Sequence, residues 1–158
     1  MTSLCCKVLE ALAGRTLATA ESCTGGGIGA ALTAVPGASR VYKGGIISYT
    51  NEVKEALLGV SPAVLERWGA VSAPVAEAMA AGARAALRAD AAVSVTGLAG
   101  PGGDEFGNPV GTVYIGYADA RGAFAREFHF AGDREAVRRQ SAAAALRTVL
   151  EALECTGS

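Results

Sequence analysis

The sequence predicts an α/β fold, specifically a three-layer α/β/α sandwich around a mixed, mostly parallel sheet. Strand and helix patterns alternate along the first part of the chain, which favours parallel strands with helices on both faces. Two alternating strands then follow one another directly, which indicates an antiparallel hairpin. With 158 residues, of which 51% are hydrophobic and 18% charged, the chain can bury one sizeable core. We expect a single domain over residues 1–158.

The first part of the chain contributes most of the expected helices. Apolar residues recur with helical spacing from Leu4 to Leu12, and Gly14 ends that pattern. Proline suits the first helical position, so Pro62 and Pro74 each mark the start of a helix. The expected elements are, in order, a helix over 4–12, a strand over 16–20, a helix from 24 or 25 to 35, a strand over 42–49, and helices over 51–58, from 61 and over 73–87.

The pattern from residue 91 onward predicts three strands and a helix. Residues 91–95 are apolar and predict a buried strand, which leads into a Gly/Pro-rich loop over 96–109. Residues 110–118 alternate in polarity, and 122–130 is their expected hairpin partner. Asp133 is a suitable N-cap for a final helix with one apolar face.

Composition and charge argue against several classes of function. The net charge is −1 and the pI about 5.8, whereas nucleic-acid-binding domains are usually basic. Neither a secretory signal nor an apolar run long enough to cross a membrane is apparent, so we expect a cytoplasmic protein without a membrane partner. Four cysteines without a C-x-x-C pair and one histidine make a zinc site improbable. We expect reduced thiols, no metal and no cofactor.

Three predicted strands end in clusters of small polar residues and glycines. The clusters are residues 21–27, 48–51 and 96–103. If the strands are parallel, all three clusters meet at the carboxyl edge of the sheet, where open α/β sheets bind ligands. This convergence predicts a small-molecule site.

Ser22 is the candidate nucleophile because it stands at a strand-to-helix turn. Such a turn exposes a hydroxyl close to the free N–H groups of the next helix, which can bind an oxyanion or a phosphate. The alternative is that Ser22 or Thr24 only caps that helix. A serine nucleophile needs a base, and His129 lies in the terminal hairpin, where a surface or packing role is expected. A lysine is the remaining solution.

Lys54 is the best-placed lysine, just beyond the strand expected to end at Tyr49. With Asn51 as N-cap it is the third helical residue, where the helix dipole disfavours a cation. It flanks an expected buried stripe, and burial would lower its pKa from about 10.4 towards the 7–8 that suits a base. The stripe consists of Val53, Ala56, Leu57 and Val60. The alternative is a solvated surface lysine.

Other candidates surround this pair. The phenol of Tyr49 is expected either to relay a proton or to cap the core at a strand end. Arg138 and Arg139 lie in the first turns of the last helix, where the dipole disfavours cations, which indicates an anionic ligand or, alternatively, two surface charges. The loop over 96–103 matches neither the Rossmann fingerprint nor the P-loop. Its glycines permit either a close ligand approach or simply a tight turn.

Five segments resemble the signatures of the CinA C-terminal domain family, and they cover nearly the whole chain in the right order. Residues 73 and 50 depart from the usual pattern, outside the proposed chemistry. The segments are AESCTGG (20–26), GGIISYTNEVK (44–54), VTGLAGPGG (95–103), PVGTVY (109–114) and GDREAVR (132–138).

The resemblance implies hydrolysis of nicotinamide mononucleotide to nicotinic acid mononucleotide and ammonia by a standalone domain, commonly a dimer. By motif position, it places the serine nucleophile, lysine base, active-site tyrosine, loop threonine and phosphate-side arginine at Ser22, Lys54, Tyr49, Thr96 and Arg138. The accompanying mechanism uses backbone groups of Thr24, Gly25 and Gly26 for the oxyanion and assigns the loop glycines, Gly100 and Gly102, to the substrate.

Three other functions remain open at this point. A non-catalytic pyridine-nucleotide or phosphate-binding module would use the same residues without turnover. A thiol enzyme would use Cys23 in place of Ser22. A DNA-binding role is disfavoured because the chain is acidic and has no basic stripe.

Overall fold

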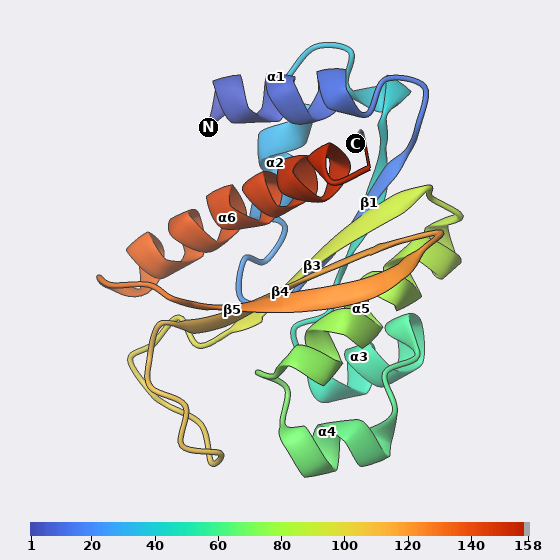
Figure 1. Ribbon diagram of the computed structural model, residues 1–158. Coiled ribbons are helices and arrows are strands. Elements are labelled where there is room, and N and C mark those ends of the chain that lie inside the picture. Colours follow the sequence, from blue (N-terminus) through green and yellow to red (C-terminus); the bar gives the residue numbers. More distant parts are fainter. Residues whose placement is uncertain (157–158) are drawn as a thin grey trace.

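A five-stranded mixed sheet lies between two layers of helices in the computed structural model, which describes residues 1–156 (Figure 1). The expected three-layer α/β/α architecture is therefore confirmed. The strands have the spatial order β2-β1-β3-β4-β5. They are β1 (Leu17–Glu21), β2 (Tyr42–Ile47), β3 (Ala91–Gly97), β4 (Thr112–Asp119) and β5 (Gly122–His129).

The sheet is parallel on one side and antiparallel on the other. β1 pairs in parallel with β2 and β3, whereas β3–β4 and β4–β5 are antiparallel. Within the described residues, two strand pairings are thus parallel and two are antiparallel. Only β4 runs in the direction opposite to the other strands. Glu21 is level with Ile47 on one side and Val95 on the other. The carboxyl ends of β1, β2 and β3 consequently meet at one edge, as predicted.

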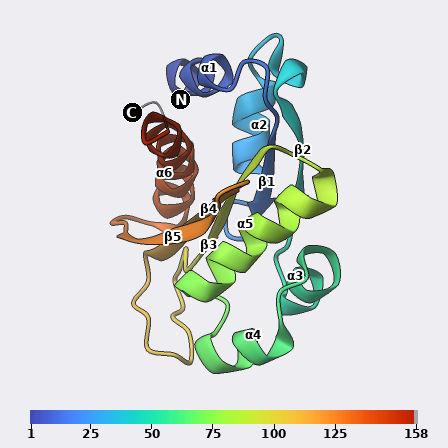
Figure 2. The ribbon, with the colours of Figure 1, turned by 45° about the vertical axis from the view of Figure 1, so that its right-hand side comes forward.

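Each face of the sheet carries its own group of helices (Figures 1 and 2). One group is α1 (Thr2–Ala11), α2 (Gly27–Thr33) and α6 (Arg134–Glu154); the other is α3 (Asn51–Leu58), α4 (Pro62–Trp68) and α5 (Ala73–Leu87). A short 3-10 helix, η1 (Ala38–Arg40), precedes β2 and was not predicted. Within residues 1–156, no helix combines the length and apolar character needed to cross a membrane.

Two apolar cores follow from this layering. Leu17 of β1 packs with Ile28 and Leu146 beneath α2 and α6. Ala18, the next residue, points to the opposite face and packs with Met79 of α5. Because β1 lies centrally and is covered on both faces, all five of its residues are buried. A polar residue in this strand therefore needs partners inside the protein.

Close packing between α5 and α3 fixes the position of the latter. Gly82 of α5 lies so near Leu58 that an added Cβ would come 1.9 Å from the Leu58 carbonyl oxygen. Only glycine permits this approach. The contact holds α3 against the sheet edge where β1, β2 and β3 end.

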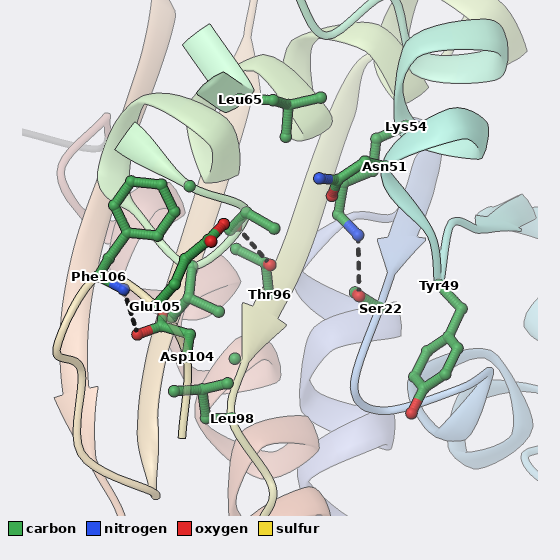
Figure 3. Close-up of a pocket in the computed structure, with 14 residues that line it drawn as sticks. Ser22, Tyr49, Asn51, Lys54, Leu65, Thr96, Leu98, Asp104, Glu105 and Phe106 are labelled. Carbon is green, nitrogen blue, oxygen red and sulfur yellow. Dashed lines mark hydrogen bonds between the residues drawn. The ribbon is translucent and has the colours of Figure 1, made fainter. Parts of the chain in front are cut away.

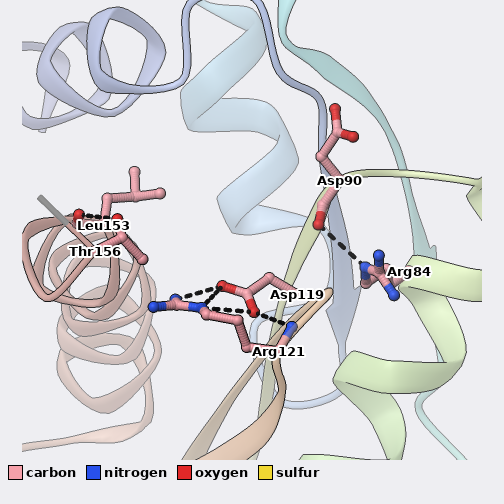
Figure 4. Close-up of polar contacts among 6 residues, drawn as sticks. All are labelled: Arg84, Asp90, Asp119, Arg121, Leu153 and Thr156. Atoms are coloured by element: carbon pink, nitrogen blue, oxygen red, sulfur yellow. Dashed lines mark hydrogen bonds and ion pairs between the residues drawn. The ribbon is translucent and has the colours of Figure 1, made fainter.

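Polar contacts lie at the opposite edge of the sheet, where β3 begins and the β4–β5 turn is found (Figure 4). Arg84 Nε donates to the Asp90 carbonyl at 3.0 Å, which joins the end of α5 to the start of β3. Arg121 Nε donates to Asp119 across the β4–β5 turn at 3.1 Å, and this contact lowers the pKa of the Asp119 carboxyl. Exposed pairs of this kind contribute about 0–1 kcal/mol, so they define the turn more than they stabilise it.

Element boundaries differ from expectation mainly around the site. Helix α2 begins at Gly27, because residues 23–26 form a turn instead of its first residues. β2 ends at Ile47, whereas β3 continues to Gly97. The connections after β1 and β2 are therefore longer than predicted, whereas the β3–β4 connection is shifted to residues 98–111 without becoming longer.

Candidate active site

A cavity of about 500 Å³ opens at this carboxyl edge (Figure 3). Ser22 and Lys54 lie at its inner end, and its walls come from the end of β3, the α4–α5 connection and the β3–β4 loop. The expected meeting of the three strand ends thus produces a pocket. Other lining residues include Tyr49, Asn51, Leu65, Thr96, Glu105 and Phe106.

Ser22 and Lys54 are in direct contact. Lys54 Nζ lies 3.1 Å from Ser22 Oγ and 2.7 Å from the Ser48 carbonyl oxygen (Figure 3). As an ammonium, Lys54 donates to both oxygens. As a neutral amine, it still donates to Ser48, and its lone pair is free to accept the Ser22 proton. The geometry suits proton transfer between hydroxyl and amine.

Burial lowers the pKa of the Lys54 amine. Lys54 is 1% exposed, and this burial lowers its pKa from 10.5 to about 8, against a smaller opposing effect of Cys23. At pH 7 roughly a tenth of such amines are neutral, compared with fewer than about one in a thousand at the ordinary pKa. A buried lysine is thus available as a base near neutral pH.

Lys54 reaches the cavity one position further along its helix than expected. Thr50 is the N-cap of α3, and its hydroxyl accepts from the Val53 N–H at 3.4 Å. The prediction of Asn51 as N-cap is therefore wrong, and Lys54 is the fourth helical residue. Burial, rather than the helix dipole, is the main cause of its lowered pKa.

The expected buried stripe of α3 is also wrong, because only its last member is buried. Leu57 is 56% exposed, whereas Lys54 and Leu58 face inward one turn apart. The lysine can occupy the interior because Ser22 and Ser48 satisfy its amine. Of the predicted stripe, Val53, Ala56 and Leu57 are partly or fully exposed, and Val60 is buried.

The turn that follows Ser22 has most of its carbonyl groups occupied. The Gly25 N–H donates to the Ser22 carbonyl, and the Gly27 N–H donates to the Thr24 carbonyl, both at 3.0 Å. Gly25 and Gly26 have φ values of +58° and +100°, which favour glycine. Within residues 1–156, the N–H groups of Cys23, Thr24 and Gly26 have no acceptor. Gly25, by contrast, already uses its N–H.

The side chain of Thr24 is buried and does not line the cavity. It is 2% exposed and donates its hydroxyl to Glu21 Oε1 at 2.7 Å. The same carboxylate accepts from the N–H groups of Ile28 and Gly29 in the first turn of α2. Those helical N–H groups were expected to be free. Sequence reasoning missed this role of Glu21.

Tyr49 borders the cavity but does not reach the Ser22–Lys54 pair. Its side chain is directed away from Lys54 (Figure 3), and its hydroxyl accepts from Arg134 Nη2 at 3.1 Å. Arg134 also donates through Nη1 to the Gly100 carbonyl at 2.7 Å. Arg134 thus joins Tyr49, the Gly-rich loop and α6, a role that the sequence analysis did not assign.

Thr96 and the β3–β4 loop form the opposite wall. The Thr96 hydroxyl donates to the Ala70 carbonyl at 2.7 Å, which ties the end of β3 to the α4–α5 connection. The ring of Phe106 lies against Gly69, where an added Cβ would come 2.5 Å from it. Asp104 accepts from the Asn108 amide nitrogen at 2.7 Å and shapes the loop. Thr96 is among the residues that line the cavity.

Arg138 and the loop glycines lie outside the residues that line the cavity. Arg138 Nε donates to the Cys23 carbonyl at 3.0 Å and Nη2 to the Thr24 carbonyl at 3.3 Å. It therefore supports the turn beside Ser22. Gly100 contributes its carbonyl to Arg134, while Gly102 has open space around its Cα.

The other candidate residues, Cys23, His129 and Arg139, are less suited to a role in catalysis. Burial raises the pKa of the Cys23 thiol to about 11, which disfavours a thiolate nucleophile. His129 contacts Thr112 and Glu127 at the outer hairpin, consistent with a surface role. Arg139 is exposed, 3.9 Å from Glu135. The cysteines of the described chain are free thiols.

Comparison with known sequences identifies relatives of the chain. A family model described as the CinA C-terminal domain matches residues 2–153. A CinA-like protein of Thermosynechococcus vestitus is 56% identical over 121 residues, which cover 76% of this chain and 29% of the relative. A CinA-like protein of Geobacter sulfurreducens is 51% identical over 133 residues, or 84% of this chain and 32% of the relative. The chain therefore spans about a third of the length of these relatives.

A shorter relative and the solved structures match over more of their own length. The nicotinamide-nucleotide amidohydrolase PncC of Escherichia coli is 48% identical over 137 residues, 86% of this chain and 83% of PncC. A CinA superfamily protein of Klebsiella pneumoniae superposes with a TM-score of 0.94 at 35% identity, over 97% of each chain. The competence/damage inducible protein CihA of Agrobacterium tumefaciens gives 0.91 at 38% identity, over 97% of this chain and 94% of CihA. The chain belongs to the CinA C-terminal domain family.

Proposed function

We propose that this chain hydrolyses the carboxamide of nicotinamide mononucleotide (NMN), giving nicotinic acid mononucleotide and ammonia. The observation that carries the proposal is the buried amine of Lys54, 3.1 Å from Ser22 Oγ at the inner end of the cavity. The similarity to PncC, a nicotinamide-nucleotide amidohydrolase, supports the reaction class.

The first chemical step forms an acyl-enzyme. Neutral Lys54 takes the proton of Ser22 as Oγ attacks the carboxamide carbon, and the carbonyl electrons move onto oxygen. The N–H groups of Cys23, Thr24 and Gly26, which have no acceptor within residues 1–156, are the backbone donors proposed for this oxyanion. When the carbon–nitrogen bond breaks, Lys54 returns its proton to the leaving group, so ammonia departs and an ester remains on Ser22.

Hydrolysis of the ester repeats the same proton transfers. Lys54 deprotonates a water molecule, which attacks the ester carbon, and then protonates Ser22 as the acid product leaves. The Ser48 carbonyl holds the amine throughout, since its 2.7 Å contact does not involve the reacting hydroxyl. Because the Tyr49 hydroxyl is bound by Arg134, direct transfer through Lys54 is favoured over a tyrosine relay.

Charges around the cavity suit a pyridinium nucleotide. Glu105 lines the cavity, and its carboxylate takes part in none of the hydrogen bonds or ion pairs found within residues 1–156. It is available to the positively charged ring of NMN. Arg134, which contacts Tyr49, and Arg138, which contacts the turn after Ser22, lie in the first turns of α6 and are the cations proposed to attract the phosphate.

Ammonia release from NMN tests the proposal. The parent chain is expected to produce one ammonia for each acid product, whereas Ser22→Ala and Lys54→Ala are expected to lose at least about 1,000-fold in kcat. Ser39→Ala and Lys7→Ala are matched controls, because both residues are exposed and distant from the cavity. Calorimetric binding of NMN without ammonia release would instead identify a non-catalytic binding module.

A further inference from the structure

The carboxylate of Glu21 is buried directly before the nucleophile and takes part in no step of the proposed reaction. Glu21 is 2% exposed. A buried charge is costly unless it is hydrogen-bonded, and this one accepts from the Thr24 hydroxyl at 2.7 Å, the Ile28 N–H at 2.9 Å and the Gly29 N–H at 3.1 Å. The Thr19 hydroxyl approaches Oε2 at 3.4 Å. Both carboxylate oxygens are thus occupied by neutral donors.

These contacts connect the end of β1 with the start of α2. Since Ile28 and Gly29 donate to Glu21, residues 22–26 must form the turn that joins the two elements. The Thr24 hydroxyl fixes the middle of this turn to the same carboxylate. The first-turn N–H groups of α2 are thereby closed to any ligand.

The backbone of Glu21 is linked to Lys54 by two hydrogen bonds through Ser48. Its carbonyl accepts from the Ser48 N–H at 2.8 Å, and the Ser48 carbonyl accepts from Lys54 Nζ at 2.7 Å. One residue therefore contacts the nucleophile turn through its side chain and the strand end that holds Lys54 through its backbone. A shift of Glu21 would move Ser22 and Lys54 relative to each other.

We infer that Glu21 is a positioning residue for the Ser22–Lys54 pair, and that the Thr24 hydroxyl acts through Glu21 instead of contacting substrate. The inference rests on the proposed function, and it concerns the side chain of Thr24, whereas the family-based expectation concerns its backbone. Kinetics can distinguish the two possible roles of the Thr24 hydroxyl, a contact to substrate and the positioning of the reacting groups. A substrate contact affects KM, whereas misplacement of the reacting groups affects kcat.

Kinetics of ammonia release from NMN separate these readings. Thr24→Val removes the hydroxyl at nearly constant volume, and we expect kcat to fall at least tenfold with KM within twofold of the parent. Thr24→Ser keeps the donor and is expected to restore kcat to within threefold. Glu55→Gln, an exposed change on α3, is the control for loss of a carboxylate. A Thr24→Val variant with raised KM and unchanged kcat would overturn the inference.

The double variant tests whether Thr24 acts through Glu21. Glu21→Gln replaces one acceptor oxygen by an amide NH₂, which cannot accept from the surrounding donors. We expect the double variant Glu21→Gln with Thr24→Val to have the kcat of the more impaired single variant. Losses that multiply would show that the two residues act independently and would contradict the inference. If Glu21→Gln does not fold, the comparison of Thr24→Val with Thr24→Ser decides alone.

Labelling of Ser22 separates this inference from the choice of substrate. Phenylmethylsulfonyl fluoride should sulfonylate Ser22 in the parent chain, measured by intact mass, with Ser22→Ala as control. Thr24→Val should slow this labelling at least fivefold, and Thr24→Ser should not. A parent chain that is labelled but releases no ammonia from NMN refutes the proposed substrate, and the labelling rates then decide on positioning. A chain that shows neither labelling nor ammonia release overturns both proposals.

Discussion

Replacing Lys54 by methionine should remove a cost that folding imposes on the protein near neutral pH. Burial lowers the pKa of this amine from 10.5 in the unfolded chain to about 8 in the folded one. At about 1.36 kcal/mol for each pKa unit, the difference disfavours the folded state by about 3 kcal/mol at pH 7. Methionine has a similar length and carries no such cost.

The pH dependence isolates this effect from lost hydrogen bonds. Between pH 8 and 10.5, the unfolded chain binds more protons than the folded chain, so the free energy of unfolding of the parent rises with pH. At pH 10 the remaining cost is about 1 kcal/mol. The contact to the Ser48 carbonyl is lost in the variant at every pH. The free energy of unfolding of the variant minus that of the parent should therefore be about 2 kcal/mol larger at pH 7 than at pH 10.

Urea unfolding of parent and Lys54→Met at pH 7 and pH 10 measures this difference. Lys7→Met serves as the control for the same substitution at an exposed lysine, on α1. Activity of Lys54→Met should be lost at both pH values. A stability difference between variant and parent that is the same at pH 7 and pH 10 would refute the argument that burial depresses the pKa of Lys54.

Four further predictions follow from the site and the packing. With a base of pKa about 8, kcat/KM should rise about tenfold from pH 7 to pH 9 and then level off, whereas a continued steep rise to pH 10 would refute a base with a pKa near 8. Cys23→Ser should keep kcat within about threefold, and iodoacetamide should not label Cys23 in the folded parent, because its pKa is about 11. Gly82→Ala should lower the free energy of unfolding by about 3 kcal/mol in urea, because its Cβ would overlap the Leu58 carbonyl; unchanged stability would show that α3 can move away. Glu105→Gln should raise KM for NMN roughly threefold to tenfold with little change in kcat, and an unchanged KM would show that the ring does not approach this carboxylate.

Sequence periodicity predicted the layers and the sheet edge well because both depend on local patterns. Pro62 at the first position of α4 and Asp133 as the N-cap of α6 mark the starts of these helices as expected. The three polar strand ends also converge, since parallel strands must end on the same side. The pairing of Ser22 with Lys54 follows from that convergence.

The orientation of individual side chains was less predictable. A helical wheel assigns apolar residues to the interior, yet α3 buries Lys54 and exposes Leu57, because two oxygens from other segments satisfy the amine. Glu21 was missed for a similar reason. A carboxylate at the end of a central, fully buried strand is the signal that could have revealed it, since such a charge requires internal donors.

The reversal of direction at β4 has a consequence for how this scaffold diversifies. β3 ends and β4 begins at the same edge, so the connection over residues 98–111 leaves and re-enters the sheet beside the cavity without needing a crossover helix. Its length can change without displacing either strand, and Ser22 and Lys54 come from other segments altogether. The size of molecule admitted can therefore evolve by insertion or deletion in this connection, while the reacting pair stays untouched.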